Sequence, residues 1–194
     1  MTDDDMLVAV LGALNALGTP YMITGSLATN FYGVPRSTED GDLVLETGRD
    51  LPKLAGMLSP PLKLDPQMSF ETITGTSRHI VEWTGGQYKI ELFMLGDDPH
   101  DRERFRRRRR GMLLGVPIWL PTAEDIVITK LTWSQLGKRT KDIDDVRNVV
   151  AVQGERLDWE YVQRWCDAHG TRELLEEVRK SVPKLDDESS GPRA

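Results

Sequence analysis

The stretch that decides the fold runs from residue 25 to residue 42 and reads GSLATNFYGVPRSTEDGD. A short β-prone run, 21–24, precedes its Gly-Ser pair, and residues 27–32 have the composition of two helical turns. A second β-prone run occupies residues 42–46. The expected order is therefore strand, Gly-Ser turn, short helix and second strand, with an acidic pair at the entry to the second strand.

That acidic pair is Asp40 and Asp42, on either side of a glycine. Side chains alternate along a strand, so two positions two apart project to the same side. Adjacent carboxylates repel each other unless a cation or a proton relieves the repulsion. If the strand carrying Glu91 lies beside them, three hard oxygen ligands would form a seat for Mg²⁺ or Mn²⁺. An Asp-X-Asp motif by itself is most often a solvated turn or a cap.

The Gly25-Ser26 pair is expected to lie between a strand and a helix. Free N–H groups and the positive end of a helix attract phosphate there, and glycine lets the backbone approach closely. Taken alone, Gly-Ser is also an everyday turn. The order of the elements, rather than either dipeptide, favours a phosphate site.

Glu91 belongs to the clearest local pattern in the chain, a predicted hairpin of strands 79–83 and 88–95. Gly85 and Gly86 in its turn are expected to take positive φ. Glu91 is then a carboxylate in the middle of an otherwise apolar strand.

The remaining pattern predicts an α+β fold, with a small mixed sheet of about four or five strands, flanking helices and a C-terminal helical unit. We expect an α/β core over 1–120, a helical unit over 121–185 and a flexible tail over 186–194. Outside the segments above, the predicted helices are 3–17, 51–58, 122–137, 142–152, 159–166 and 174–178, and the predicted strand is 116–120.

The composition and charge of the chain limit the partners, covalent links and cellular location that we expect. The formal charge is −6 over 194 residues, so any contact with nucleic acid has to be local. One cysteine and three histidines without ligand spacing argue against a disulfide and a structural zinc site, and we assign the histidines no role. No apolar run approaches the roughly 20 residues of a membrane span. We expect a cytoplasmic protein with no membrane partner.

The sequence resembles the minimal nucleotidyltransferases of the polymerase-β superfamily, especially the AbiEii-like branch that includes toxins of toxin–antitoxin pairs. The stretch 25–42 carries the first part of the resemblance. Three later blocks follow in the family's order: Glu91 in IELFML, Lys130 in PTAEDIVITKL, and the segment KDIDD over 141–145.

The resemblance implies a Mg²⁺-dependent (or Mn²⁺-dependent) transferase that moves an NMP from an NTP to a hydroxyl acceptor, with RNA or tRNA as one such acceptor and an antitoxin as a possible protein partner. Its implied metal ligands and catalytic residues are Asp40, Asp42 and Glu91. Its implied nucleotide-binding and phosphate-binding residues are Gly25, Ser26, Lys130, Lys141 and Asp142.

Two positions depart from the family pattern. Gly41 stands where a branched apolar residue is usual, which predicts an unfilled packing site. Glu91 stands where Asp is common, and its extra methylene moves the carboxylate oxygens. The alternative reading is therefore a catalytically degenerate module of the same fold that binds nucleotide, RNA or an acidic protein.

Cationic and aromatic residues leave further alternatives open. Arg36 can reach phosphate or pair with an acid such as Glu39. Seven arginines fall within nine residues and are expected at the surface, where they would contact RNA phosphates or pair with acids; they are Arg102, Arg104, Arg106, Arg107, Arg108, Arg109 and Arg110. Tryptophans, Trp133 among them, are expected to fill the core and interfaces rather than stack on bases.

Overall fold

The computed structural model describes residues 1–72 and 75–182 and shows the predicted α+β fold. Its main sheet has six strands in the order β1-β2-β6-β5-β3, with β4 also paired to β5. Strands β2 and β6 are parallel, and the other pairs are antiparallel. The strands are β1 (Tyr21–Thr24), β2 (Asp40–Leu45), β3 (Leu62–Leu64), β4 (Ser69–Glu71), β5 (Thr76–Trp83) and β6 (Lys89–Met94).

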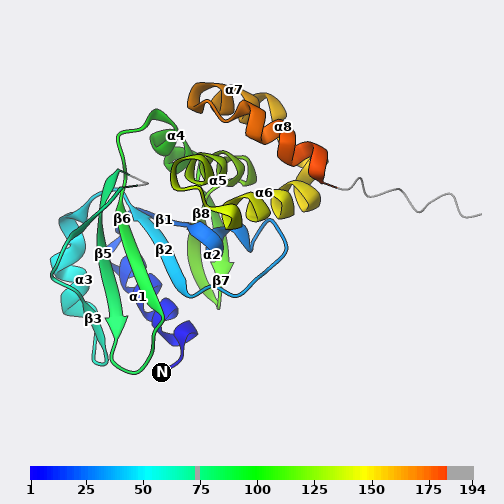
Figure 1. Cartoon of the computed structure of the whole chain (residues 1–194). Helices are drawn as coiled ribbons and strands as arrows, with labels where there is room; N and C mark the ends of the chain where they lie inside the picture. The colour runs from blue at the N-terminus through cyan, green and yellow to red at the C-terminus, as the bar shows by residue number, and fades with distance from the viewer. Residues whose placement is uncertain (73–74, 183–194) are drawn as a thin grey trace, which may run out of the picture.

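Helices surround this sheet in two groups. Helices α1 and α3 lie together beside the sheet, and α5 to α8 stack on one another on the far side of β1 and β2 (Figure 1). The helices are α1 (Asp3–Leu17), α2 (Gly25–Thr29), α3 (Leu51–Met57), α4 (Pro99–Arg107), α5 (Ala123–Gly137), α6 (Thr140–Gln153), α7 (Trp159–His169) and α8 (Arg172–Ser181).

A separate hairpin of β7 (Arg109–Leu113) and β8 (Val116–Leu120) connects the two groups. The carbonyl oxygen of Pro117 in β8 accepts hydrogen bonds from the Asn15 amide and the Tyr21 hydroxyl, at 2.8 and 3.2 Å. These bonds hold β8 against α1 and β1. One apolar core, built from α1, the sheet, β8 and α5 to α8, runs continuously through the molecule.

The hairpin β5–β6 forms as predicted, with Ile80 opposite Glu91. The expected positive φ at its glycines is wrong, because neither Gly85 nor Gly86 is among the positive-φ residues. The Trp83 ring lies over the turn instead, and a Cβ would stand 2.2 Å from it at Gly85 and 2.4 Å at Gly86. Glycine is needed at this turn for space rather than for handedness.

The structure also moves the boundaries of one predicted helix and contains elements that the sequence pattern did not predict. Helix α2 occupies Gly25–Thr29 rather than 27–32, and residues 30–32 continue it as hydrogen-bonded turns. The sequence pattern missed β3, β4, β7 and α4, all short or highly charged. The predicted tail 186–194 and residues 183–185 of the predicted helical unit lie outside the described residues. No helix within the described part of the chain has the length and apolar character needed to cross a membrane.

Candidate active site

Three carboxylates project from one face of the sheet. Strands β2 and β6 pair in parallel with Asp42 opposite Glu91 and Asp40 opposite Lys89. Directly opposed residues of a parallel pair lie on the same face, and so do residues two apart. Asp40, Asp42 and Glu91 therefore line one cavity of about 200 Å³, together with Gly25 and Ser26.

The start of α2 presses against Asp42. Gly25 has φ +62°, and a Cβ built on it would lie 1.9 Å from Oδ2 of Asp42. No side chain fits there, so Gly25 is required both for its backbone conformation and for this close approach. The Gly25-Ser26 backbone thereby forms part of the cavity wall beside the carboxylates.

The electrostatics of this wall favour a bound cation. Burial, followed by repulsion from Asp40 and Glu91, raises the pKa of Asp42 to about 7. Such a raised value means that the negative charge of Asp42 is under-compensated by the protein itself. Asp40 and Asp42 offer hard oxygen donors of the kind that Mg²⁺ and Mn²⁺ take, and they fit such an ion.

Glu91 differs from the two aspartates because it already has cationic partners. Its Oε2 accepts a hydrogen bond from Arg78 Nη1 at 3.0 Å, and its Oε1 pairs with Lys89 Nζ. Arg78 also lies 3.6 Å from Glu71, a second acid that lines the cavity. The third predicted acid is thus beside the other two, but as part of an ion-pair chain on β4, β5 and β6.

The opposite wall comes from α5 and α6 and carries a buried charge network. Lys130 Nζ lies 2.8 Å from Asp142 Oδ1 and 2.8 Å from Asp145 Oδ2, and the three side chains are at most 3% exposed. Arg36 pairs with Asp145 at 2.9 Å, and Arg139 Nε approaches Asp142 Oδ2 to 3.1 Å without hydrogen-bond geometry. Three cations share two carboxylates, which leaves one positive charge in excess.

Several of the residues predicted to bind phosphate belong to this buried charge network. Arg36 pairs with Asp145 rather than Glu39, and its Nη2 donates to the Ser26 hydroxyl oxygen. The Ser26 proton remains free to donate into the cavity. Lys130 lines the cavity while paired, Asp142 is buried behind it, and Lys141 lines the cavity from an exposed position.

The packing site expected to be unfilled at Gly41 is occupied. A Cβ at this position would lie 2.8 Å from the Tyr88 hydroxyl, 3.5 Å from Ile90 and 3.6 Å from Leu7. Tyr88, just before β6, fills the space that a branched residue would take. The expectation of a void beside the two aspartates was therefore wrong.

Sequence reasoning missed five residues that line the cavity: Glu71, Arg78, Phe93, Trp133 and Arg139. Trp133 had been expected to fill the core. The strand alternation held one usable signal, since Arg78 pairs with Phe93 and so shares the face of Glu91. The other three depend on how β4, α5 and α6 pack, for which the sequence carries no local pattern.

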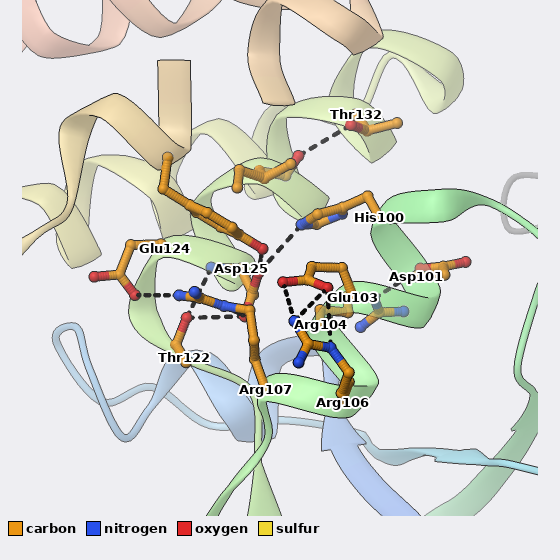
Figure 2. A network of polar contacts seen from close by, with 12 residues as sticks. His100, Asp101, Glu103, Arg104, Arg106, Arg107, Thr122, Glu124, Asp125 and Thr132 are labelled. Atoms are coloured by element: carbon orange, nitrogen blue, oxygen red, sulfur yellow. Dashed lines mark hydrogen bonds and ion pairs between the residues drawn. The ribbon is translucent and has the colours of Figure 1, made fainter. Parts of the chain in front are cut away.

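The arginine run forms helix α4 and the start of β7, and most of it is occupied by internal contacts. Arg104 is only 4% exposed and pairs with Asp101 at 2.7 Å, so the expectation of a wholly exposed run was wrong. Figure 2 shows Arg106 beside Glu103, and Arg107 directed toward Glu124 and Asp125.

Of the other four arginines in the run, Arg102 and Arg108 also make internal contacts, whereas Arg109 and Arg110 are exposed. Arg102 pairs with Asp97, and Arg108 donates to the Phe105 carbonyl at 2.6 Å. Arg109 and Arg110 are exposed and have no acidic partner within ion-pair distance in the described part of the chain. Any contact with RNA phosphates therefore rests mainly on these two.

No protein-family model and no curated protein matches this sequence. Among solved structures, the chain is similar to ANT(2'')-Ia in complex with adenylyl-2''-tobramycin, with a TM-score of 0.59 and 16% identity over 89% of this chain and 99% of that one. A candidate nucleotidyltransferase from H. pylori gives 0.54 and 17% over 95% and 83%. An antigenic nucleotidyltransferase-like protein from Paracoccidioides brasiliensis gives 0.53 and 19% over 92% and 93%. The chain has the nucleotidyltransferase fold, and these likenesses do not single out the AbiEii-like branch.

Proposed function

We propose that this protein is a Mg²⁺-dependent or Mn²⁺-dependent nucleotidyltransferase that moves an NMP from an NTP to a hydroxyl acceptor. The observation that carries the proposal is the cavity with two unlike walls. Carboxylates that include the under-compensated Asp42 line its sheet side, and a network with excess positive charge lines its helical side. A triphosphate with a bound divalent cation complements both walls at once.

In this proposal Asp40 and Asp42 hold the metal, which when bound neutralises phosphate charge and orients the attacking and leaving oxygens. The Ser26 hydroxyl and the adjoining backbone N–H groups donate to the terminal phosphates. Arg139 and Lys141 face the phosphates from the helical side. The positive charge of Lys130 attracts the phosphates from within the buried network.

Glu91 receives the acceptor proton in this scheme. The acceptor oxygen bonds to the α-phosphorus, its proton goes to Oε1 of Glu91, and pyrophosphate leaves. Lys89 occupies that oxygen in the structure, and its side chain is 41% exposed, so it can swing into solvent and free Oε1. Arg78 keeps hold of Oε2 and fixes the carboxylate in place.

Trp133 supplies an aromatic surface at the same cavity. Its half-buried side chain stands between the nucleotide cavity and the neighbouring pockets around Arg104. A base that stacks on an aromatic ring gains about 1–3 kcal/mol. Trp133→Ala should therefore raise the KM for NTP about tenfold or more, whereas Trp119→Ala, outside the cavity, should leave it unchanged.

The direct test incubates the pure protein with each α-labelled NTP and Mg²⁺, with total RNA in one arm and tobramycin in another. The proposal expects label transfer and pyrophosphate release that disappear with EDTA and in Asp42→Ala. Asp97→Ala removes an exposed carboxylate outside the cavity and should retain activity. Absence of transfer to every acceptor, with nucleotide still bound, would instead support the catalytically degenerate module, which the pairing of Glu91 favours.

The acceptor arm also decides the finer proposal of a toxin-like role. Transfer to RNA, lost on neutralising Arg109 and Arg110, supports an RNA acceptor, and growth arrest on expression, relieved by a partner protein, supports a toxin with an antitoxin. Transfer to tobramycin supports a small-molecule acceptor instead of RNA.

A further inference from the structure

A second cluster of ligating side chains lies where α4 meets α7. Asp98, His100 and His169 each offer one ligand atom, and these atoms lie within 4.8 Å of one another. Asp98 and His100 stand at the start of α4, and His169 is the last residue of α7. The cluster lines a cavity of about 220 Å³, bordered by Thr129 and Trp133.

From this arrangement we infer that Asp98, His100 and His169 form a binding site for a divalent transition metal of the Zn²⁺ class. Two imidazoles and one carboxylate are a ligand set that suits Zn²⁺ and Fe²⁺, unlike the all-oxygen set of the candidate active site. The site is independent of the proposed nucleotidyl transfer.

Hydrogen bonds fix both imidazoles for ligation. His100 Nε2 lies 3.3 Å from Asp125 Oδ1, a fully buried carboxylate that also accepts from Tyr161 and Thr122 (Figure 2). The carboxylate holds the His100 proton on Nε2 and leaves the Nδ1 lone pair for a metal. A carboxylate behind a ligating histidine is the usual support of such sites.

His169 is fixed in the same manner from the other side. The Thr132 hydroxyl donates to the Ile128 carbonyl at 3.0 Å, so its oxygen accepts from His169 Nδ1 at 3.1 Å. The proton then sits on Nδ1, and the Nε2 lone pair points toward Asp98 Oδ1 at 3.7 Å. Ligand atoms about 2.1 Å from a tetrahedral Zn²⁺ lie roughly 3.4 Å apart, so metal binding requires the three ligand atoms, which lie within 4.8 Å of one another, to draw closer together.

Asp98 can ligate without giving up its structural role. Its Oδ1 caps α4 by accepting from the backbone N–H groups of His100 and Asp101, at 2.8 and 3.2 Å. Oδ2 is left for the metal. The N-terminus of α4 therefore stays capped in either state.

A second observation points to a ligand in this cavity. The Thr129 hydroxyl is buried and has no hydrogen-bond partner among the described residues, and Thr129 is only 7% exposed. A buried hydroxyl without a partner is costly, because it has lost its hydrogen bonds to water. A water molecule in the fourth coordination position of the metal would supply that partner.

Zinc titration by calorimetry on the full-length Asp40→Asn/Asp42→Asn variant tests the inference, since that background removes two oxygen ligands of the other site. We expect one equivalent of Zn²⁺, and Co²⁺ in its place should give the strong visible absorption of a nitrogen-ligated ion of low coordination number. His169→Gln and Asp98→Asn should each weaken Zn²⁺ binding at least about tenfold. Asn keeps the helix cap.

His79→Gln is the matched control, because His79 on β5 is the remaining histidine of the chain and should bind nothing. The inference is overturned if no Zn²⁺ binds, if His79→Gln weakens binding as much as His169→Gln, or if both cluster variants bind like their parent. Should His169→Gln not fold, as judged by circular dichroism in EDTA, Asp98→Asn decides the question alone.

Discussion

The two walls of the candidate active site shift the pKa of a buried aspartate in opposite directions. On the sheet wall, burial and the neighbouring carboxylates raise the pKa of Asp42 to about 7. On the helical wall, burial would raise the pKa of Asp145, but hydrogen bonds from Arg36 and Lys130 outweigh it and hold that pKa below the ordinary value. Acids whose charge is compensated within the protein stabilise the fold, and acids left under-compensated mark the place for a ligand.

Removing the central cation of the helical wall should have the largest effect. Lys130→Met keeps the length of the side chain but leaves Asp142 and Asp145 buried with fewer partners. Breaking one partner out of a buried pair costs about 3–5 kcal/mol, which should appear as a lower urea midpoint with an unchanged slope. Lys141→Met, at an exposed position, should change stability by less than about 0.5 kcal/mol. Equal stability of the two variants would contradict the compensated network.

On the sheet wall the corresponding change should stabilise the protein. Folding raises the pKa of the Asp42 carboxyl. The free energy of unfolding therefore falls as pH rises from the unfolded pKa, near 4, to the folded pKa, about 7. Asp42→Asn removes that loss, so in EDTA at pH 8 its free energy of unfolding should exceed that of the parent by on the order of 4 kcal/mol, since folding raises the pKa of Asp42 by about three, and at pH 4 by almost nothing. Thermal unfolding at both pH values measures the difference between variant and parent.

Asp145→Asn is the matched control for Asp42→Asn, because the same change should have the opposite sign. It removes the charge that Arg36 and Lys130 both contact, so it should lower stability at pH 8. Mg²⁺ at millimolar concentration should raise the melting temperature of the parent and of Asp145→Asn, but not of Asp42→Asn. A gain in stability for both Asn variants would remove the distinction between the walls.

The sheet wall was the more predictable of the two. Alternation along the strands predicted that Asp40 and Asp42 share a side and that Glu91 interrupts an apolar strand, and these statements need only local geometry. The sequence could state only that the three acids would meet if the strand of Glu91 lay beside the strand of Asp40 and Asp42. The structure meets that condition, because β2 and β6 pair in parallel with Asp42 opposite Glu91. The functional roles of these residues stay predictions until activity is measured.

The family resemblance named Lys130, Lys141 and Asp142 of the helical wall. The contacts of that wall, and the cluster of Asp98, His100 and His169, could not be predicted because they depend on packing between distant segments. Arg36 meets Asp145 across 109 residues, and His100 meets His169 across 69, at no spacing that a motif would reveal. The buried Arg104 is a further case, since a run of arginines predicts exposure until Asp101, one turn earlier, is seen to pair with it.

Gly41 lies between Asp40 and Asp42 and offers a smaller test of the sheet wall. Gly41→Ala places a Cβ 2.8 Å from the Tyr88 hydroxyl, which has to move. We expect a loss of about 1 kcal/mol in the parent and a smaller loss in the Tyr88→Phe background, where the clashing oxygen is absent. A double-mutant cycle by urea unfolding measures the coupling. Zero coupling would mean that Tyr88 does not fill the space beside Gly41.

The smallest effect on stability is expected at Arg109 and Arg110, because neither loses an ion pair when its charge is removed; Arg110 lies over the Trp119 ring, 5.2 Å from its centroid. Arg109 and Arg110 carry no acidic partner within ion-pair distance in the described part of the chain, so Arg109→Gln/Arg110→Gln should change unfolding free energy by less than about 0.5 kcal/mol. If the two arginines contact RNA phosphates, the same variant should flatten the slope of log affinity against log salt by roughly 1.5, at about 0.7–0.9 for each contact. Arg106→Gln, whose partner Glu103 already offsets its charge, should alter that slope less. An identical slope in parent and double variant would show that these two charges do not contact RNA phosphates.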